Sequence, residues 1–208
     1  MAEKQKLGVL CSGRGTDLQS IIDAIGRGEV KAEIAVVLTD KPDAFALERA
    51  KKAGIKSVCV NRKEYEGREP FEEALIKELE EAGVTLVVLA GFMRILTPLF
   101  VRHFAGRIMN IHPALLPSFP GAHAHRDVLA YGVKVSGCTV HFVDEGTDSG
   151  PIIMQAAVPV LPGDTEETLG ARVLEQEHII YPKAVQLYCE GHLKVEGRHV
   201  HILEGDNK

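Results

Sequence analysis

The chain has 208 residues, of which 45% are hydrophobic and 25% are charged, and its formal net charge is −5 at pH 7. This composition is typical of a globular domain and excludes the chain-wide basic surface that nucleic-acid or membrane-surface binding requires. No apolar stretch approaches the ~20 residues of a membrane span, and the N-terminal residues do not form a secretory signal. The four cysteines, at positions 11, 59, 138 and 189, have no C-x-x-C spacing. We therefore expect buried free thiols in a reducing cytoplasm rather than disulfides or a zinc site.

Short apolar runs alternate with longer amphipathic segments through the first half of the chain. The apolar runs predict strands over Lys6–Ser12, Glu33–Thr39, Lys56–Asn61, Thr85–Gly91 and Arg107–His112. The amphipathic segments predict helices over Asp17–Gly26, Asp43–Ala53, Glu69–Ala82 and about Pro98–Phe104. This alternation is typical of βαβ units, and near-continuous apolar strands indicate a parallel sheet that is buried on both faces.

The rhythm changes after His112. A loop over 113–123 precedes a short helix near Arg126–Tyr131, and two strands, Ser136–Asp144 and Pro151–Leu161, are close enough in sequence to pair antiparallel. A long helix is expected from about Thr165 to Cys189, with Asp164 or Thr165 as N-cap and Pro182 kinking or interrupting it. The tail, Lys194–Leu203, reads as one edge strand. These elements predict an α/β fold in a single domain, 1–208: a mostly parallel twisted, Rossmann-like sheet with helices on both faces and an antiparallel C-terminal portion.

An amide, an imidazole and a carboxylate form the most informative constellation. Asn110 and His112 stand two residues apart at the end of a predicted strand, so their side chains project to the same side. Asp148 lies in a predicted turn between two strands. The amide can stabilise a developing oxyanion, the imidazole can move a proton, and the carboxylate can hold the imidazole. The three residues are therefore suited to acyl transfer.

Two further loops follow predicted strands at the same sheet edge. The turn Ser12–Asp17 contains Gly13 and Gly15 and opens a helix, which suits a phosphate; an ordinary tight turn is the alternative. It lacks the third glycine of the dinucleotide fingerprint, because position 18 is leucine. Met93, Ile95 and Leu96 could line an apolar slot for a flat ligand, or could simply belong to the core.

Histidines also raise a metal hypothesis, with His123, His125, His112 and Asp148 as conceivable ligands. No zinc-binding spacing occurs among them, and exposed or hydrogen-bonded histidines are commoner, so we expect no metal. Glu177 belongs to a charged run of the long helix, which a solvated helix face explains on spacing alone.

Taken together, these segments resemble the phosphoribosylglycinamide formyltransferase family along nearly the whole chain, from Leu7 to about Leu203. The most specific match is Met109–Gly121, which contains Asn-Ile-His-Pro. Others are Gly137–Asp144 leading to Asp148–Pro151, Ser12–Leu18, and Gln176–His178 followed by Tyr181-Pro182. The resemblance implies the formyltransferase fold and transfer of a formyl group from 10-formyltetrahydrofolate to the amine of glycinamide ribonucleotide in purine biosynthesis, without a metal.

The resemblance also implies a role for each matching position. Asn110, His112 and Asp148 match the catalytic trio. The ribonucleotide is expected at Gly15, Thr16, Asp17 and Glu177, and the folate at Arg68, Met93, Arg94, Ile95, Leu96 and Asn110. Asp17 stands where the family usually has asparagine, and a carboxylate there repels a phosphate unless it caps the helix. Ala114 stands where serine is usual.

Three rivals remain beside this interpretation. Methionyl-tRNA formyltransferases normally add a C-terminal tRNA-binding domain, and formyl-folate hydrolases normally add an N-terminal regulatory domain; we expect neither here. A non-catalytic nucleotide-binding module has no need of the trio. The expected partners are small molecules only, with no nucleic acid and no membrane, in a cytoplasmic monomer or weak homodimer.

Overall fold

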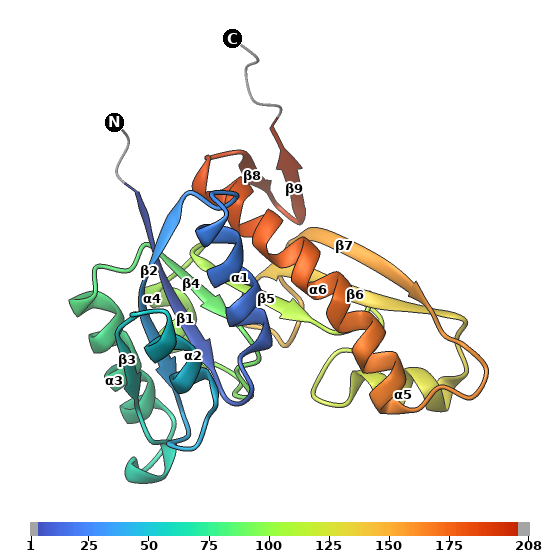
Figure 1. Cartoon of the computed structure of the whole chain (residues 1–208), viewed down its shortest axis with the longest axis horizontal. Helices are drawn as coiled ribbons and strands as arrows, with labels where there is room; N and C mark the ends of the chain where they lie inside the picture. Colours follow the sequence, from blue (N-terminus) through green and yellow to red (C-terminus); the bar gives the residue numbers. More distant parts are fainter. Residues whose placement is uncertain (1–3, 204–208) are drawn as a thin grey trace. The chain divides into compact units, whose positions relative to one another are not determined.

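The structure is a computed structural model that describes residues 4–203, and the chain divides after Met109 into two compact units (Figure 1). The first unit holds the alternating strands and helices of the N-terminal half. The second begins at Asn110 and holds the antiparallel strands and the long helix. Strand β5, Ile108–His112, carries the chain from one unit into the other. The prediction of one domain over 1–208 stays a prediction.

The first unit is a parallel sheet with helices between its strands. Strands β1 (Gln5–Cys11), β2 (Ala32–Thr39), β3 (Ser57–Cys59) and β4 (Leu86–Leu89) lie in the order β3-β2-β1-β4. All three pairings among them are parallel. The helices are α1 (Thr16–Gly26), α2 (Ala46–Lys52), α3 (Glu69–Glu81) and α4 (Pro98–His103), with a 3₁₀ turn η1 at Arg62–Glu64. Since parallel crossovers are right-handed, α1 and α2 cover one face of this sheet and α3 covers the other.

Apolar residues at helical spacing bury these helices against the sheet. On α1, Leu18, Ile21 and Ala24 are fully buried, and on α3 the side chains of Leu75 and Leu79 are fully buried. Burying a leucine side chain contributes about 1.5–3 kcal/mol relative to leaving it exposed, so this stripe holds each helix in place. The predicted βαβ rhythm is thus confirmed, with each strand ending at the edge where the glycine turn and the 91–96 loop begin.

The second unit is built from antiparallel pairs covered by one long helix. Strands β6 (Val135–Phe142) and β7 (Ile152–Pro159) pair antiparallel, as predicted, and helix α6 (Glu166–Cys189) packs against both. A short helix, α5 (Ala124–Tyr131), packs against α6. Beyond β7 the order continues to β9 (His199–Ile202) and β8 (Leu193–Glu196).

Two expectations about the C-terminal part are corrected. The tail is a hairpin of two short strands rather than one strand, because Gly197 adopts φ 60° and reverses the chain between β8 and β9. Helix α6 also continues through Pro182 without interruption. Tyr181, Pro182, Ala184 and Val185 are buried, so packing of this helix outweighs the hydrogen bond that proline cannot donate.

Local capping fixes where α6 begins. Thr165 is its N-cap and forms a capping box with Thr168. Asp164, just before it, accepts two hydrogen bonds from the Arg172 guanidinium at 2.8 and 2.9 Å. These bonds, together with the Leu161 amide, hold the pKa of Asp164 well below its usual range. The connection from β7 is therefore tied directly to the second turn of the helix.

The cysteines are free thiols in this structure, as expected. Cys11 and Cys138 are buried, whereas Cys59 and Cys189 are half-buried. Burial raises the pKa of the Cys189 thiol to about 12 and raises that of Cys11 as well, so neither is a nucleophile at neutral pH. Among residues 4–203, no helix is both long and apolar enough to cross a bilayer.

Candidate active site

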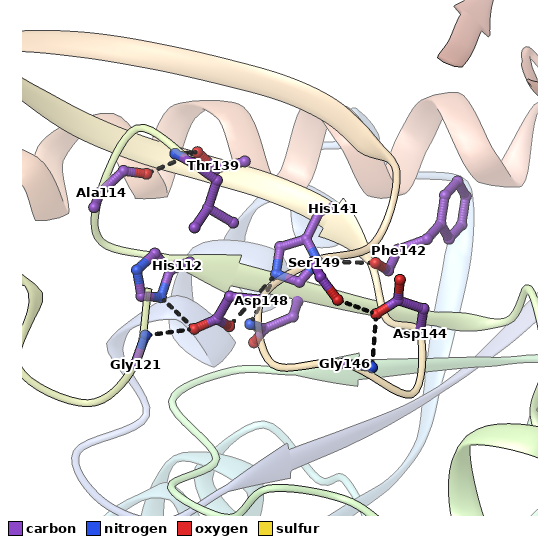
Figure 2. A network of polar contacts seen from close by, with 12 residues as sticks. His112, Ala114, Gly121, Thr139, His141, Phe142, Asp144, Gly146, Asp148 and Ser149 are labelled. Atoms are coloured by element: carbon purple, nitrogen blue, oxygen red, sulfur yellow. Dashed lines mark hydrogen bonds and ion pairs between the residues drawn. The ribbon is translucent and has the colours of Figure 1, made fainter. Parts of the chain in front are cut away.

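The second unit brings the predicted trio together, and Figure 2 shows two of its members, His112 and Asp148. Asn110 and His112 come from the end of β5, and Asp148 comes from the connection between β6 and β7. The Asp148 Oδ2 atom lies 3.4 Å from His112 Nδ1. His112 is 4% exposed, so this pair is shielded from bulk water and its electrostatic coupling is stronger than that of a surface pair.

Both ring nitrogens of His112 face oxygen acceptors. While Nδ1 faces the Asp148 carboxylate, Nε2 lies 2.8 Å from the backbone carbonyl of Phe119. An imidazolium can donate to both acceptors at once, whereas a neutral ring can donate to only one. Each ring nitrogen therefore has an oxygen within reach, so either nitrogen can take part when the ring passes on a proton.

A tight loop presents Asp148. Its φ of 49° is in the left-handed region, which a non-glycine residue adopts only when its surroundings hold it there. The backbone amide of Gly121 donates to Asp148 Oδ2 at 2.8 Å. Within the loop, the Asp144 carboxylate accepts from the Ser149 hydroxyl at 2.6 Å and from the Gly146 amide at 3.0 Å (Figure 2). The carboxylate of the trio is thus fixed from two sides.

His141 is the functional residue that sequence reasoning missed as a partner of the trio. Its Nδ1 lies 2.8 Å from the Phe142 carbonyl, an acceptor only, so Nδ1 carries the hydrogen and Nε2 is free to accept in the neutral ring. The Asn110 amide nitrogen is 3.2 Å from that Nε2, and Asp148 Oδ1 is 3.9 Å from it. Burial lowers the pKa of His141, which favours this neutral form.

The alternation of polar residues along β6 could have identified His141 as a site residue. Thr139 and His141 are polar at alternate positions of an otherwise apolar strand, so they share a face of β6. The pairing of β6 with β7 shifts register between Val140 and His141, which could not be seen in the sequence. The hydrogen bond to Asn110 selects an amide orientation in which one N–H is held by the ring and the second remains for a ligand.

Thr139 anchors the loop that follows His112. Its hydroxyl donates to the Ala114 carbonyl at 2.7 Å and accepts from the Leu116 amide at 3.0 Å. Since the Ala114 contact uses the backbone, any residue can supply it, and the alanine methyl is fully buried. The departure from the usual serine therefore leaves the loop geometry intact.

In the first unit, the glycine turn packs closely against helix α2. Gly15 adopts φ 68° and precedes the first residue of α1, Thr16. A Cβ at position 15 would lie 2.9 Å from the Ala46 Cβ, so helix α2 closes the far side of the turn. Arg49, also on α2, donates to the Arg14 carbonyl at 2.7 Å. The N-terminal amides of α1 therefore begin at a rigid turn.

Asp17 lies in the first turn of α1 and is buried. Burial raises its pKa to about 6, because a charged carboxylate loses hydration there. At pH 7 most copies are nevertheless ionised. The N-cap residue of α1 is Gly15, so Asp17 is not the residue that caps this helix. The repulsion between Asp17 and a phosphate stays a prediction.

The loop after β4 is fastened at both ends. The Met93 amide donates to the Ser12 hydroxyl at 2.8 Å, which ties this loop to the glycine turn. At the other end, Thr97 donates to the buried Glu72 carboxylate through its backbone amide at 2.8 Å and through its hydroxyl. The loop is thus preorganised within the first unit rather than free.

The predicted folate-binding residues divide into two kinds. Met93 and Ile95 are 62% and 66% exposed, and they present apolar side chains outward, whereas Leu96 is buried. Arg94 donates to the Asp40 carboxylate at 2.7 Å, and Arg68 donates to the Ile95 carbonyl. The two arginines therefore hold the loop, and the side chains of Met93 and Ile95 remain exposed.

Glu177 and the histidines complete the set of predicted site residues. Glu177 lies buried in the middle of α6, which differs from the solvated face that its charged neighbours indicated. Within the described residues, no group of three histidine, cysteine, aspartate or glutamate side chains is arranged around a possible metal ion.

Comparisons with known proteins agree with this geometry. A family model described as formyl transferase matches residues 5–185. The phosphoribosylglycinamide formyltransferase of Escherichia coli (strain K12) is 48% identical over 187 residues, which cover 90% of this chain and 88% of that protein. The glycinamide ribonucleotide transformylase 1 of Symbiobacterium toebii superposes with a TM-score of 0.96 at 50% identity, covering 98% of this chain and 96% of that one.

A formyltetrahydrofolate deformylase from Pseudomonas syringae pv. tomato also superposes, with a TM-score of 0.90 at 26% identity, over 98% of this chain and 67% of that one. The predicted α/β fold class, with its mostly parallel sheet and antiparallel C-terminal strands, is confirmed by the transformylase structure.

Proposed function

The chain belongs to the formyl transferase family, an enzyme family, and we propose that it transfers a formyl group from 10-formyltetrahydrofolate to the amine of glycinamide ribonucleotide. The observation that carries this proposal is the buried cluster of Asn110, His112 and Asp148, with the carboxylate 3.4 Å from the imidazole. We propose a role in purine biosynthesis, a cytoplasmic location and two small-molecule substrates. We propose no nucleic-acid or membrane partner, and a monomer or weak homodimer.

The chemistry needs an oxyanion donor and a proton carrier. When the substrate amine attacks the formyl carbon, the carbonyl oxygen gains charge, and the Asn110 N–H that His141 leaves available can donate to it. The Nε2 atom of His112 can donate to the same oxygen once it turns from the Phe119 carbonyl to the substrate. The attacking nitrogen must lose a proton and the departing folate nitrogen must gain one, so no net proton is consumed. His112 is the group placed to carry it, directly or through water.

Asp148 supports this role electrostatically. The Asp148 carboxylate lies 3.4 Å from Nδ1, where its charge orients the ring, and its bond to the Gly121 amide keeps it in place. The formyl carbon is already activated by the folate nitrogen to which it is attached, so the steps above are assigned to this chain's own side chains.

The remaining predicted residues supply binding. We assign the phosphate of the ribonucleotide to Gly15, Thr16 and Asp17 and its glycinamide portion to Glu177. The flat pterin is assigned to the loop 93–96, where the exposed side chains of Met93 and Ile95 offer apolar contact. Arg68 and Arg94 hold that loop through Ile95 and Asp40. Asn110 contributes to the folate side as well as to the oxyanion.

The direct test is to mix the protein with glycinamide ribonucleotide and 10-formyltetrahydrofolate and to follow deformylated folate by absorbance. We expect turnover that depends on both substrates, and we expect His112→Ala to reduce it about 10²–10⁴-fold while the protein stays folded. Near-full activity of His112→Ala would remove the proton carrier from the mechanism.

The same assay separates the runner-up function. A formyl-folate hydrolase releases deformylated folate without the ribonucleotide, using water as acceptor. The deformylase of Pseudomonas syringae is 26% identical to this chain, whereas the Symbiobacterium transformylase is 50% identical, which favours transfer. Product formation that is unchanged when the ribonucleotide is omitted would support hydrolysis instead. A methionyl-tRNA acceptor is tested in parallel by formylation of charged initiator tRNA.

A further inference from the structure

The C-terminal hairpin reaches the loop that carries Asp148. Strands β8 and β9 pair antiparallel, and β9 joins the sheet where His199 pairs with Ile152 at the start of β7. Arg198 stands at the beginning of this hairpin's second arm. Its Nη2 atom donates to the backbone carbonyl of Ser149 at 2.6 Å. A cation from the tail thus binds the residue that directly follows Asp148.

This contact acts on a loop with little freedom elsewhere. On its inner side the loop is gathered around Asp144, which accepts from Ser149 and Gly146. At its end, a Cβ on Gly150 would lie 1.8 Å from the Phe142 carbonyl oxygen, so glycine permits the chain to pass close to β6. The Ser149 carbonyl is the group of this loop that Arg198 holds. Asp148, at φ 49°, lies between these fixed points.

We propose that Arg198 is a positioning residue for Asp148: by holding the Ser149 carbonyl it keeps the Asp148 carboxylate against His112 and Gly121. This rests on the proposed function, because it assigns Arg198 a part in the same formyl transfer. The guanidinium is charged and the acceptor is a carbonyl, so the bond is charge-assisted and stronger than an ordinary backbone bond. Without this bond the Ser149 side chain keeps its contact with Asp144, but its carbonyl loses the restraint from Arg198, so Asp148 can shift relative to His112 and Gly121.

The experiment compares three variants of the full chain. Arg198→Ala removes the donor, Arg198→Lys keeps a charged donor, and Lys194→Ala is the matched control. Lys194 lies on the same hairpin, and its ammonium pairs with Glu196 of the same strand, at 2.6 Å. Two quantities are measured: formyl-transfer kcat and KM for glycinamide ribonucleotide, and the hydrogen-exchange rate of the Gly121 amide in the unliganded protein.

For Arg198→Ala we expect kcat to fall about tenfold with KM for the ribonucleotide changed less than twofold, since only the arrangement at the reacting centre is disturbed. The Gly121 amide, which donates to Asp148, should exchange about tenfold faster. Arg198→Lys should recover part of both losses and also serves if Arg198→Ala does not fold. Lys194→Ala should leave both quantities at the wild-type values.

Either quantity can overturn the proposal. If Arg198→Ala and Lys194→Ala show the same Gly121 exchange rate, the hairpin does not hold Asp148. If exchange accelerates but kcat stays at the wild-type value, the contact is structural and does not position the trio. If the wild-type protein transfers no formyl group to the ribonucleotide, the proposed function fails, and the Gly121 exchange rate alone still decides whether Arg198 holds the loop.

Discussion

Replacement of Gly15 by alanine tests the geometry of the glycine turn most directly. Gly15 adopts φ 68°, and the new Cβ would lie 2.9 Å from the Ala46 Cβ and 3.0 Å from its Cα. The left-handed conformation costs a non-glycine residue about 1–2 kcal/mol. Crowding against the α2 backbone adds about 1–3 kcal/mol, because backbone cannot move aside as a flexible side chain can. We therefore expect Gly15→Ala to lower the free energy of unfolding by about 2–5 kcal/mol.

Gly13→Ala is the matched control, because it lies two residues away in the same turn. A Cβ at position 13 has no atom within 4 Å, so its effect on stability should stay within about 0.5 kcal/mol. Unfolding by urea measures the stability of both variants. Calorimetry with glycinamide ribonucleotide and with a folate analogue, at a temperature where each variant is folded, measures binding.

The two measurements refute different parts of the reasoning. Equal stability of Gly15→Ala and Gly13→Ala would mean that the turn does not press against α2 as described. A destabilised Gly15→Ala protein that binds the ribonucleotide with wild-type affinity would remove the phosphate from this turn. Loss of ribonucleotide affinity with little change for the folate analogue is the result we expect.

Three further predictions concern charges in and around the site. Burial raises the pKa of Asp17 from 3.8 to about 6, so the folded protein binds the proton of this carboxyl more tightly than the unfolded chain does. The stability that this proton contributes is present below about pH 4 and is lost as the pH rises through about 6. Asp17→Asn should therefore raise the free energy of unfolding at pH 8 by up to about 3 kcal/mol, and urea unfolding at pH 4 and pH 8 should show a smaller difference than in the wild type. Asp148→Asn should cut turnover about 10²–10³-fold with ribonucleotide affinity unchanged. The reason is that charges 3.4 Å apart interact by at most roughly 5 kcal/mol at an effective dielectric of ~20. Steady-state kinetics that match those of the wild type would contradict this prediction. Leu96→Asp places a charge at a buried position of the 93–96 loop and should weaken binding of a phosphate-free folate analogue but not of the ribonucleotide. If calorimetry gave the reverse order, the folate would have to be assigned to the glycine turn and the ribonucleotide to this loop.

The sequence was most informative where periodicity and burial act together. Strand-spaced Asn110 and His112, and the apolar stripes of α1 and α3, follow from side-chain geometry that any buried strand or helix shares. The hairpin of the tail was missed because a single glycine, Gly197, decides whether eight residues form one strand or two. Pro182 does not interrupt α6, because tertiary packing around Tyr181 outweighs the hydrogen bond that the proline cannot donate.

The site shows the same division. Asp148 could be placed in a turn, but its positive φ and the contacts of its loop with Asp144 and Arg198 could not be predicted. The contact between His141 and Asn110 joins two strands, and neither residue type indicates it alone. Roles that came from the family resemblance, Glu177 and Arg68 among them, remain predictions that binding measurements must test.

The hydroxyl of Ser12 has a consequence for drug resistance. It holds the Met93 amide of the loop assigned to the pterin, and the Ser12 amide donates to the Gly91 carbonyl at 3.0 Å. The same residue begins the turn assigned to the phosphate. A substitution at position 12 that weakens antifolate binding by displacing the 93–96 loop therefore also disturbs the neighbouring glycine turn. Resistance substitutions should therefore not arise at position 12 under selection by such a compound, because they would weaken binding of the natural substrate as well.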